Sequence, residues 1–167
     1  MYTLLNELLN KYEKARRIRL RAIIQRVSEA KVEVDDEITG EIEKGFLVLI
    51  GVEDADTEED CDYLVRKITK MRIFEDADQK MNLSLKDVGG ELLSISQFTL
   101  HANTKKGNRP SFVDAAKPDF ANELYEQFNE KVRSEGINVE TGVFGAHMNV
   151  TLTNDGPVTI ALDSKNK

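Results

Sequence analysis

Residues 45–52 read GFLVLIGV, an uninterrupted apolar run in a chain that is otherwise rich in charged residues. A continuous apolar run of this length, with no alternation of polar and apolar side chains, is typical of a strand that is buried on both faces. The run therefore predicts a strand in the middle of the core, and the segments on either side of it decide the fold class.

Short β-rich runs precede this strand at residues 21–27 and 30–34, and the domain is expected to begin just before them. Residues 3–17 carry apolar side chains at helical spacing, which indicates an amphipathic helix. We therefore divide the chain into an N-terminal amphipathic extension, residues 1–19, and a domain, residues 20–167. The extension has neither the apolar core and cleavage site of a signal peptide nor the acid-poor composition of a transit peptide.

Two core helices are expected after the central strand. Thr57 and the three acidic residues after it form a capping-box-like start, and apolar side chains then recur at helical spacing as far as Met71. Cys61 lies on that apolar face, where a small buried residue explains it better than a nucleophile does. Pro118 opens the second helix, which ends at Gly136. Its apolar positions are Phe120, Leu124, Phe128 and Val132.

Further β-rich runs surround these helices. Residues 91–100 (ELLSISQFTL) predict a strand with alternating faces, and residues 74–85 a polar surface connection. Three closing strands are expected at residues 137–144, 147–153 and 158–162, with a turn at residues 154–157 between the last two. The predicted fold class is α+β, with mostly antiparallel β-sheets in a barrel-like core, two main helices and an N-terminal helical extension.

Composition excludes several functional classes. No apolar run approaches the roughly 18 residues that would span a bilayer, and a net charge of −7 argues against non-specific coating of nucleic acid. One cysteine cannot form an internal disulfide, and with two histidines it is too little for a zinc site built on soft ligands. A reducing, cytosolic setting without metal or cofactor fits best.

Basic residues gather in one long loop, residues 101–117. Loops of this length inside a compact domain are usually functional. Lys105, Lys106 and Arg109 lie there beside Gly107 and Pro110, and they are either a solvated cluster or a contact for a phosphate. Residues 1–20 are also basic, with five Lys and Arg against two Glu, or +3, which leaves −10 for the remaining residues.

Candidate catalytic residues are sparse when they are judged from spacing alone. Ser94 and Ser96 occupy the polar face of the predicted strand, no GxSxG elbow surrounds them, and the imidazoles are only those of His101 and His147. A protein triad is therefore a weak hypothesis. Thr99 stands where the strand enters the long loop, as a ligand contact or as an ordinary turn residue.

Asn154-Asp155-Gly156-Pro157 requires either an unusual turn or a cis peptide bond, and Asn154 and Thr159 can hydrogen-bond to it. Together with other segments, this motif resembles the D-aminoacyl-tRNA deacylases in order and spacing, from about residue 20 to residue 164. The matching segments are RAIIQRV at residues 21–27, SQFTL at 96–100, GNRPSF at 107–112 and NDGPVT at 154–159.

The resemblance implies a homodimeric, cytosolic hydrolase that cleaves the ester between a D-amino acid and the 3′-terminal adenosine of tRNA, with glycyl-tRNA as a second substrate. It also implies that the Gly156-Pro157 bond is cis and that this motif enters the partner's pocket, where it excludes L-amino acids sterically. Arg26, Asn154 and Thr159 would support the motif. Lys105, Lys106 and Arg109 would meet phosphates of the tRNA.

The chemistry implied by the resemblance comes largely from the substrate, whose ribose 2′-hydroxyl lies next to the ester. Backbone N–H groups of Phe98 and Thr99 would bind the oxyanion, with Ser96 and Gln97 lining the same strand end and Phe98 near the adenine. The other pocket wall would be Phe144, Gly145, Ala146 and Met148. His147 stands where an acidic residue is common in the family, and His101 replaces a commoner tyrosine, so neither histidine receives a role.

Two alternative functions remain at this point, and the role of residues 1–19 is also open. A non-catalytic dimeric module that binds an RNA 3′ end or an adenine nucleotide would use the same pocket, and a relative with a trans Gly-Pro bond would act on L-aminoacyl or other mischarged tRNAs. Residues 1–19 have no counterpart in the typical family member, whose chain begins with Met where Leu20 stands. They are either an extension that adds tRNA affinity or a sign that translation starts later.

Overall fold

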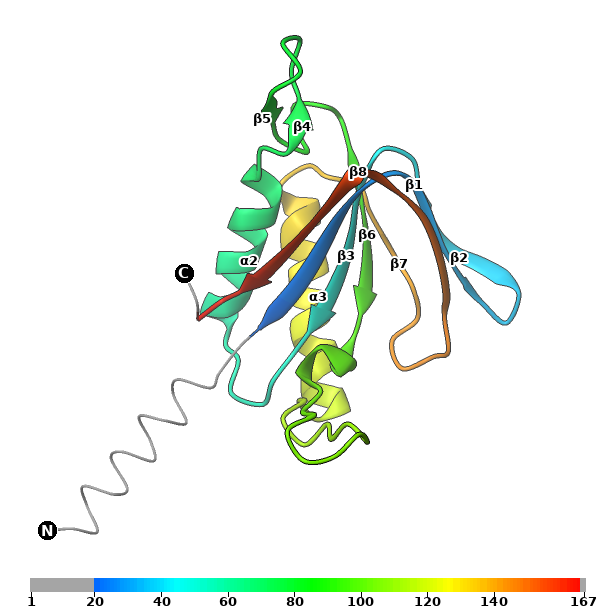
Figure 1. Cartoon of the computed structure of the whole chain (residues 1–167), viewed down its shortest axis with the longest axis vertical. Coiled ribbons are helices and arrows are strands. Elements are labelled where there is room, and N and C mark those ends of the chain that lie inside the picture. Colours follow the sequence, from blue (N-terminus) through cyan, green and yellow to red (C-terminus); the bar gives the residue numbers. More distant parts are fainter. Residues whose placement is uncertain (1–19, 166–167) are drawn as a thin grey trace, which may run out of the picture.

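The computed structural model describes residues 20–165, in which two long helices pack against a strongly curved sheet (Figure 1). The predicted N-terminal helix lies outside the described residues. None of the described helices is both long and apolar enough to cross a membrane. The elements in chain order are β1 (Arg21–Val34), β2 (Glu37–Ile42), β3 (Gly45–Gly51), α2 (Glu58–Lys70), β4 (Phe74–Glu75), β5 (Met81–Leu83), β6 (Glu91–Ser96), the 3-10 helix η1 (Phe98–His101), α3 (Pro118–Ser134), β7 (Val139–Thr141) and β8 (Asn149–Asp163).

The main sheet is mixed, and most of its strand pairing is antiparallel. Strand β1 pairs antiparallel with β2, β3 and β8, whereas β3 pairs parallel with β6, and β6 parallel with β7. The sheet curls until β2 approaches β7. The approach is so close that a Cβ atom on Gly40 would lie only 2.7 Å from the carbonyl oxygen of Thr141. The barrel-like core that the sequence predicts is therefore present as a sheet that nearly closes.

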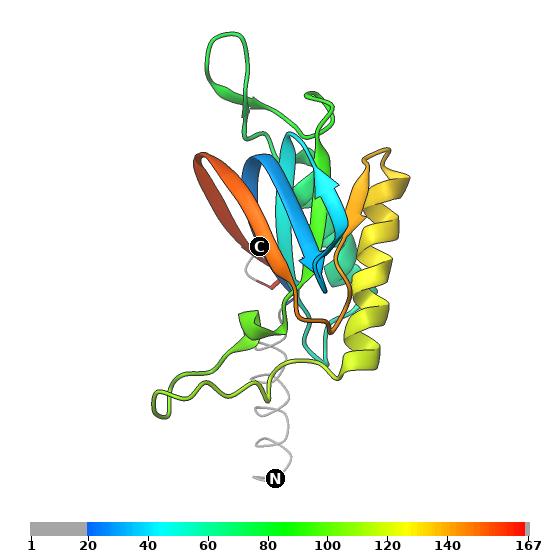
Figure 2. The same ribbon diagram turned by 90° about the vertical axis from the view of Figure 1, so that its right-hand side faces the viewer.

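The predicted central strand is confirmed as β3, and its side chains enter two separate cores. Phe46, Val48 and Ile50 face the helices, where they join the apolar sides of α2 and α3. Leu47 points the other way, into a second cluster inside the curl of the sheet. Figure 2 shows α3 along one side of the sheet and β8 on the side away from it. Burial on both faces thus explains why the run carries no polar residue.

Both core helices are confirmed. Helix α2 follows Thr57, whose backbone N–H and hydroxyl each donate to a carboxylate oxygen of Asp60 at 3.0 Å. Cys61 is fully buried on its inner face, and burial raises the pKa of this thiol to about 12, which fits an inert core residue. Helix α3 begins at Pro118 and is followed by Gly136 at φ +83°, a conformation that glycine adopts without a steric penalty.

Several predicted strand boundaries are wrong because long-range pairing overrides local signals. Residues 21–34 form one strand, β1, and residues 149–163 form one strand, β8, which runs through the predicted turn at residues 154–157. The two strands pair along almost their whole length, with register shifts near Val27. The extra residues are therefore absorbed as a bulge within a long strand rather than as a hairpin turn.

Two further segments differ from the expectation. The strand predicted for residues 91–100 ends at Ser96 and is followed by η1. Its side chains are buried on both faces rather than alternately, because helices cover one face and the curl of the sheet covers the other. Residues 74–85 contain the small β4–β5 hairpin, with buried Phe74 and Leu85, rather than a polar connection. Of residues 137–144, only β7 forms a strand.

Candidate active site

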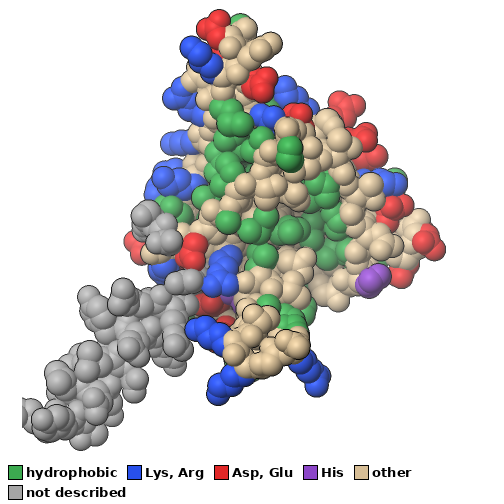
Figure 3. Space-filling model, viewed as in Figure 1, with side chains coloured by type: hydrophobic (Ala, Val, Ile, Leu, Met, Phe, Trp, Pro, Cys, Tyr) green, Lys and Arg blue, Asp and Glu red, His purple; other side chains and the backbone are tan. Residues whose placement is uncertain are grey.

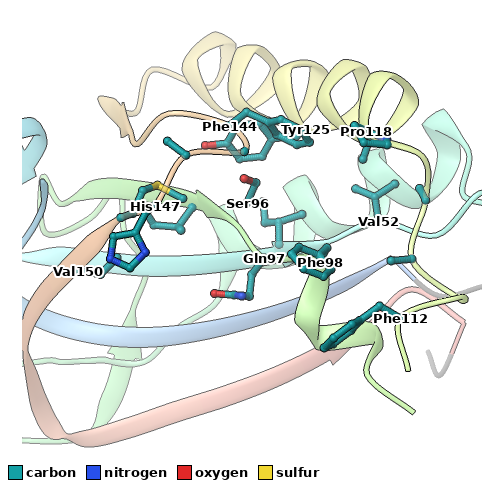
Figure 4. A pocket seen from close by; sticks show the side chains of 18 residues that line it. Val52, Ser96, Gln97, Phe98, Phe112, Pro118, Tyr125, Phe144, His147 and Val150 are labelled. Carbon is teal, nitrogen blue, oxygen red and sulfur yellow. The ribbon is translucent and has the colours of Figure 1, made fainter. Parts of the chain in front are cut away.

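A cavity of about 560 Å³ opens at the end of the sheet where β3 and β6 both finish (Figure 4). Its wall is mainly apolar and comes from four places: the ends of β3 and β6, the long loop, the first half of α3, and the segment before β8. Parallel pairing of β3 with β6 brings the two strand ends to the same edge, which is a common place for a binding site. Predicted site residues that line the cavity are Ser96, Gln97, Phe98, Phe144, Gly145, Ala146 and Met148.

The floor of the cavity is the junction between β6 and η1. The backbone N–H of Gln97 donates to the carbonyl oxygen of Ile50 at 2.7 Å, so the chain remains tied to β3 as it leaves the sheet. Phe98 stands at the rim, 56% exposed, with its ring edge-to-face against Phe112 at a centroid distance of 5.1 Å. Figure 4 shows the Ser96 hydroxyl pointing toward Tyr125 and Phe144, and Gln97 pointing away from them.

Thr99 does not line the cavity. Its side chain is exposed, and its hydroxyl accepts a short hydrogen bond from the Gln97 side-chain amide. Its backbone N–H, like that of Phe98, belongs to the first turn of a 3-10 helix, which supplies no internal acceptor for the first donors. These two N–H groups therefore have no acceptor within η1.

Tyr125 of α3 is the main wall residue that sequence reasoning missed. It is 2% exposed, its hydroxyl donates to the carbonyl oxygen of Ser94 at 2.8 Å, and its ring is tilted against Phe144 at 6.1 Å. Burial raises the pKa of the Tyr125 hydroxyl. The available signal was its place next to Leu124 on the apolar stripe of the second helix.

The two serines and two histidines do not form a catalytic pair. Ser94 is fully buried beneath α3, and His101 is buried with its Nδ1 atom 2.9 Å from the Glu53 carboxylate. His147 is exposed and lines the cavity on the opposite side from η1. Within residues 20–165, no hydrogen bond joins Ser96 to either imidazole.

Gly156 and Pro157 lie in the β8 bulge, are exposed and do not line the cavity of their own chain. The peptide bond between them is cis. The Arg26 guanidinium, which is almost fully buried, donates to the carbonyl oxygens of Asp155 at 3.1 Å and Ile73 at 2.6 Å. It also contacts the Asp155 carboxylate at 3.3 Å. A charged group held in this way fixes the bulge from behind.

Asn154 fastens the same bulge from within the sheet. Its side-chain amide donates to the carbonyl oxygens of Arg26 and Val158, both at 2.9 Å. The Thr159 hydroxyl donates to the Asn154 side chain at 3.4 Å. The structure thus brings Arg26, Asn154 and Thr159 together around the motif, as the sequence motif suggested.

The basic cluster lies outside the cavity. Lys105, Lys106 and Arg109 are all exposed in a loop whose base is closed by two backbone hydrogen bonds between Asn103 and Ser111, at 2.8 and 2.9 Å. In Figure 2 this loop projects from the body of the protein. Within residues 20–165, no three His, Cys, Asp or Glu side chains are placed to hold a metal ion.

Comparison with known proteins places this geometry in a family. The family model described as D-Tyr-tRNA(Tyr) deacylase matches residues 23–163. A D-aminoacyl-tRNA deacylase of Flavobacterium johnsoniae is 58% identical over 149 residues, or 89% of this chain and 99% of that protein. Another, from Thermus aquaticus, is 58% identical over 148 residues, or 89% of this chain and 97% of that protein.

Solved structures share the fold. A c-Myc DNA unwinding element binding protein superposes with a TM-score of 0.80 at 40% identity, covering 85% of this chain and 97% of that one. A probable eukaryotic D-amino acid tRNA deacylase, at 19% identity, covers 87% of this chain and all of that one with a TM-score of 0.76. With a family match across most of the domain and relatives at 58% identity, the chain belongs to the D-Tyr-tRNA(Tyr) deacylase family.

Proposed function

We propose that this protein hydrolyses the ester bond of D-aminoacyl-tRNA, releasing free tRNA and the D-amino acid. The observation that carries the proposal is the cavity at the β6–η1 junction in a chain of this family. Residues 96–98 (SQF) form its floor and residues 144–148 (FGAHM) form one of its walls. Proteins named D-aminoacyl-tRNA deacylase match nearly the whole domain at 58% identity.

The substrate supplies much of the chemistry. The 2′-hydroxyl of the terminal ribose is held beside the ester carbonyl, so it can assist the attack without a protein nucleophile. The N–H groups of Phe98 and Thr99 at the start of η1 are the donors for the oxyanion, and loss of one such donor typically costs about 10²–10³ in rate. A reaction assisted by the substrate hydroxyl and by backbone N–H groups is compatible with a cavity in which no serine is bonded to a histidine. The apolar wall beside Phe98 receives the adenine.

Selection against L-amino acids is assigned to Gly156 and Pro157 of a second copy of this chain. The motif is exposed, does not line its own cavity and is held by Arg26 and Asn154, which suits a rigid element that acts by exclusion in another subunit. Such a gate rejects side chains that project on one side of Cα and gives no discrimination against glycine. Glycyl-tRNA is therefore a second expected substrate.

A homodimer would use the open face of the sheet. Ile23 of β1, Leu49 of β3 and Ala161 of β8 are neighbours in the strand register, and none of them is fully buried. Figure 3 shows hydrophobic side chains gathered over this part of the sheet. Exposed apolar surface on a sheet marks an interface. The same copy that covers this face brings its own β8 bulge to the partner's cavity.

Contacts to the rest of the tRNA are assigned to the basic loop, with Lys105, Lys106 and Arg109 on phosphates near the 3′ end. Residues 1–19 are treated as a basic extension of the domain that begins at residue 20, and they add tRNA affinity. The cytoplasm, where aminoacyl-tRNA is used, is the proposed location. No cofactor is part of this scheme.

The decisive experiment compares deacylation of D-tyrosyl-tRNA and L-tyrosyl-tRNA by the purified chain, with an enzyme-free control. Rapid loss of only the D-ester is expected. Loss of neither ester would contradict hydrolysis and favour a dimeric module that binds an RNA 3′ end or adenine nucleotide without cleaving it. Equal loss of both esters would contradict the assigned role of Gly156 and Pro157.

A further inference from the structure

A contact between two ionisable residues, a buried histidine and a partly buried glutamate, lies at the end of η1. His101, the last residue of η1, is 2% exposed, and its Nδ1 atom lies 2.9 Å from Oε1 of Glu53. Glu53 is in the connection between β3 and α2, so the contact joins the end of η1 to a different part of the chain. Neither residue lines the cavity.

The far end of this contact is itself fixed. The backbone N–H of Glu53 donates to the Asp56 carboxylate at 2.7 Å, and the Asp56 N–H donates back to the carbonyl oxygen of Glu53 at 3.1 Å. Asp60 then accepts from Thr57 at the start of α2, and Lys165 contacts the Asp60 carboxylate at 2.7 Å. The connection that holds Glu53 is therefore anchored to the beginning of a core helix.

Three contacts restrain η1. Besides the pair of Glu53 and His101, the Arg21 guanidinium donates to the carbonyl oxygen of Leu100 at 2.6 Å. Gly51 forms the surface beneath, where a Cβ atom would lie 2.9 Å from the carbonyl oxygen of Gln97 and 3.0 Å from Nε2 of His101. The 3-10 helix thus rests on bare backbone and is held at both ends, by the Gln97 N–H bond to Ile50 at its start and by these contacts at its end.

We propose that Glu53 and His101 are positioning residues for hydrolysis: their contact fixes the end of η1 and so aims the N–H groups of Phe98 and Thr99 at the reacting carbonyl. The inference rests on the proposed function of the same site. Donors that stabilise charge in the transition state must be oriented beforehand, and small displacements of such groups lower the rate. The pair therefore affects the chemical step more than substrate binding.

The test measures kcat and KM on D-tyrosyl-tRNA for Glu53→Gln, His101→Leu and His101→Gln. We expect kcat to fall about 10–100-fold in His101→Leu, less than the about 10²–10³-fold cost of losing an oxyanion donor outright, because the donors remain and are only misaligned, with KM within about twofold. His101→Gln supplies a polar side chain that can donate to the Glu53 carboxylate and should recover most of kcat. A combined Glu53→Gln and His101→Leu variant should be no slower than His101→Leu alone, because the two residues act as one contact.

Glu135→Gln is the matched control, because it breaks an exposed ion pair of the same 2.9 Å length, to Lys86, at the end of the domain away from the cavity. Its kcat should equal that of the unaltered chain. Thermal unfolding of each variant shows whether it is folded. If His101→Leu does not fold, kcat of Glu53→Gln, which keeps the shape of the side chain, decides the test. An unaltered kcat in folded Glu53→Gln and His101→Leu, or a change in KM alone, would overturn the positioning role while the proposed function stands. Absence of hydrolysis by the unaltered chain would overturn the proposed function first.

Discussion

Asn154 helps to hold the shape of the β8 bulge. Its amide donates to the carbonyl oxygens of Arg26 and Val158 across the bulge. Asn154→Ala leaves both acceptors without this partner, so we expect the free energy of unfolding to fall by about 1–3 kcal/mol, measured with urea. A less rigid bulge should also raise hydrolysis of L-tyrosyl-tRNA relative to the D-ester.

Asn149→Ala is the control for this prediction, since Asn149 is an exposed asparagine in the same strand. It should change neither stability nor selectivity. If Asn154→Ala behaved like Asn149→Ala in both measurements, the two hydrogen bonds would have no part in holding the bulge.

Asp56 makes stability depend on pH. Burial raises the pKa of its carboxyl from 3.8 to about 7, an effect opposed by the hydrogen bond from Glu53 N–H. The folded state then holds the proton more tightly than the unfolded state. The contribution of Asp56 to stability is therefore fully present below about pH 4 and is lost as the pH rises toward 7.

Asp56→Asn removes this titration, so its stability relative to the unaltered chain should improve as the pH is raised from 4 to 8. Urea unfolding at several pH values measures the difference. Asp36→Asn, which removes an exposed carboxylate in the β1–β2 turn, is the control and should keep the decline. A constant difference between Asp56→Asn and the unaltered chain at all pH values would contradict the assignment.

The long loop, residues 101–117, carries a cluster of positive charge. Its base is fixed by the Asn103–Ser111 bridge, and its three basic side chains are exposed. Replacing Lys105, Lys106 and Arg109 together with Ala should raise KM for D-aminoacyl-tRNA and leave kcat nearly unchanged. Each lost phosphate contact should reduce the slope of log(kcat/KM) against log salt by about 0.7–0.9.

A variant that replaces Lys67, Lys70 and Lys80, which are exposed on α2 and the β4–β5 hairpin, removes the same charge elsewhere and is the matched control. An equal change of slope in the loop variant and in this control would show that net charge, not the loop, determines the salt dependence.

Residues 1–19 are a second basic element, with a net charge of +3 to residue 20. If they add tRNA affinity, a chain that starts at residue 20 with an initiating Met should show a raised KM, most strongly at low salt, because screening weakens long-range attraction. Steady-state kinetics at several salt concentrations measure this. An unchanged KM throughout the series would remove the extension from substrate binding.

At the scale of the whole molecule, the cavity and the motif that is assigned to guard it lie in different places on one chain. Ile23→Glu puts a charge on the apolar face formed with Leu49 and Ala161, and desolvating that charge in an interface is costly. We expect this variant to be a monomer by light scattering and to lose the preference for the D-ester. Ile38→Glu makes the same substitution at a side chain that is 51% exposed on β2, and should stay a dimer. A dimeric, selective Ile23→Glu would place the interface elsewhere.

Local sequence determined much of this protein. The unbroken apolar run gave a doubly buried strand, the capping residues and apolar spacing gave both core helices, and the short motifs indicated the family, because each of these depends on residues that are neighbours along the chain. Among the site residues, Arg26, Asn154 and Thr159 do meet around Gly156 and Pro157.

Tertiary structure alone decided the rest. Pairing with β1 turned a predicted turn into a bulge of β8, parallel pairing of β3 with β6 brought two strand ends to one edge of the cavity, and packing of α3 on β6 placed Tyr125 in its wall. The contact between His101 and Glu53 likewise joins residues 48 positions apart. Such contacts depend on which strands become neighbours in the sheet. No local pattern encodes the choice of neighbours, because the free energy that favours it comes from the burial of apolar surface across the whole fold.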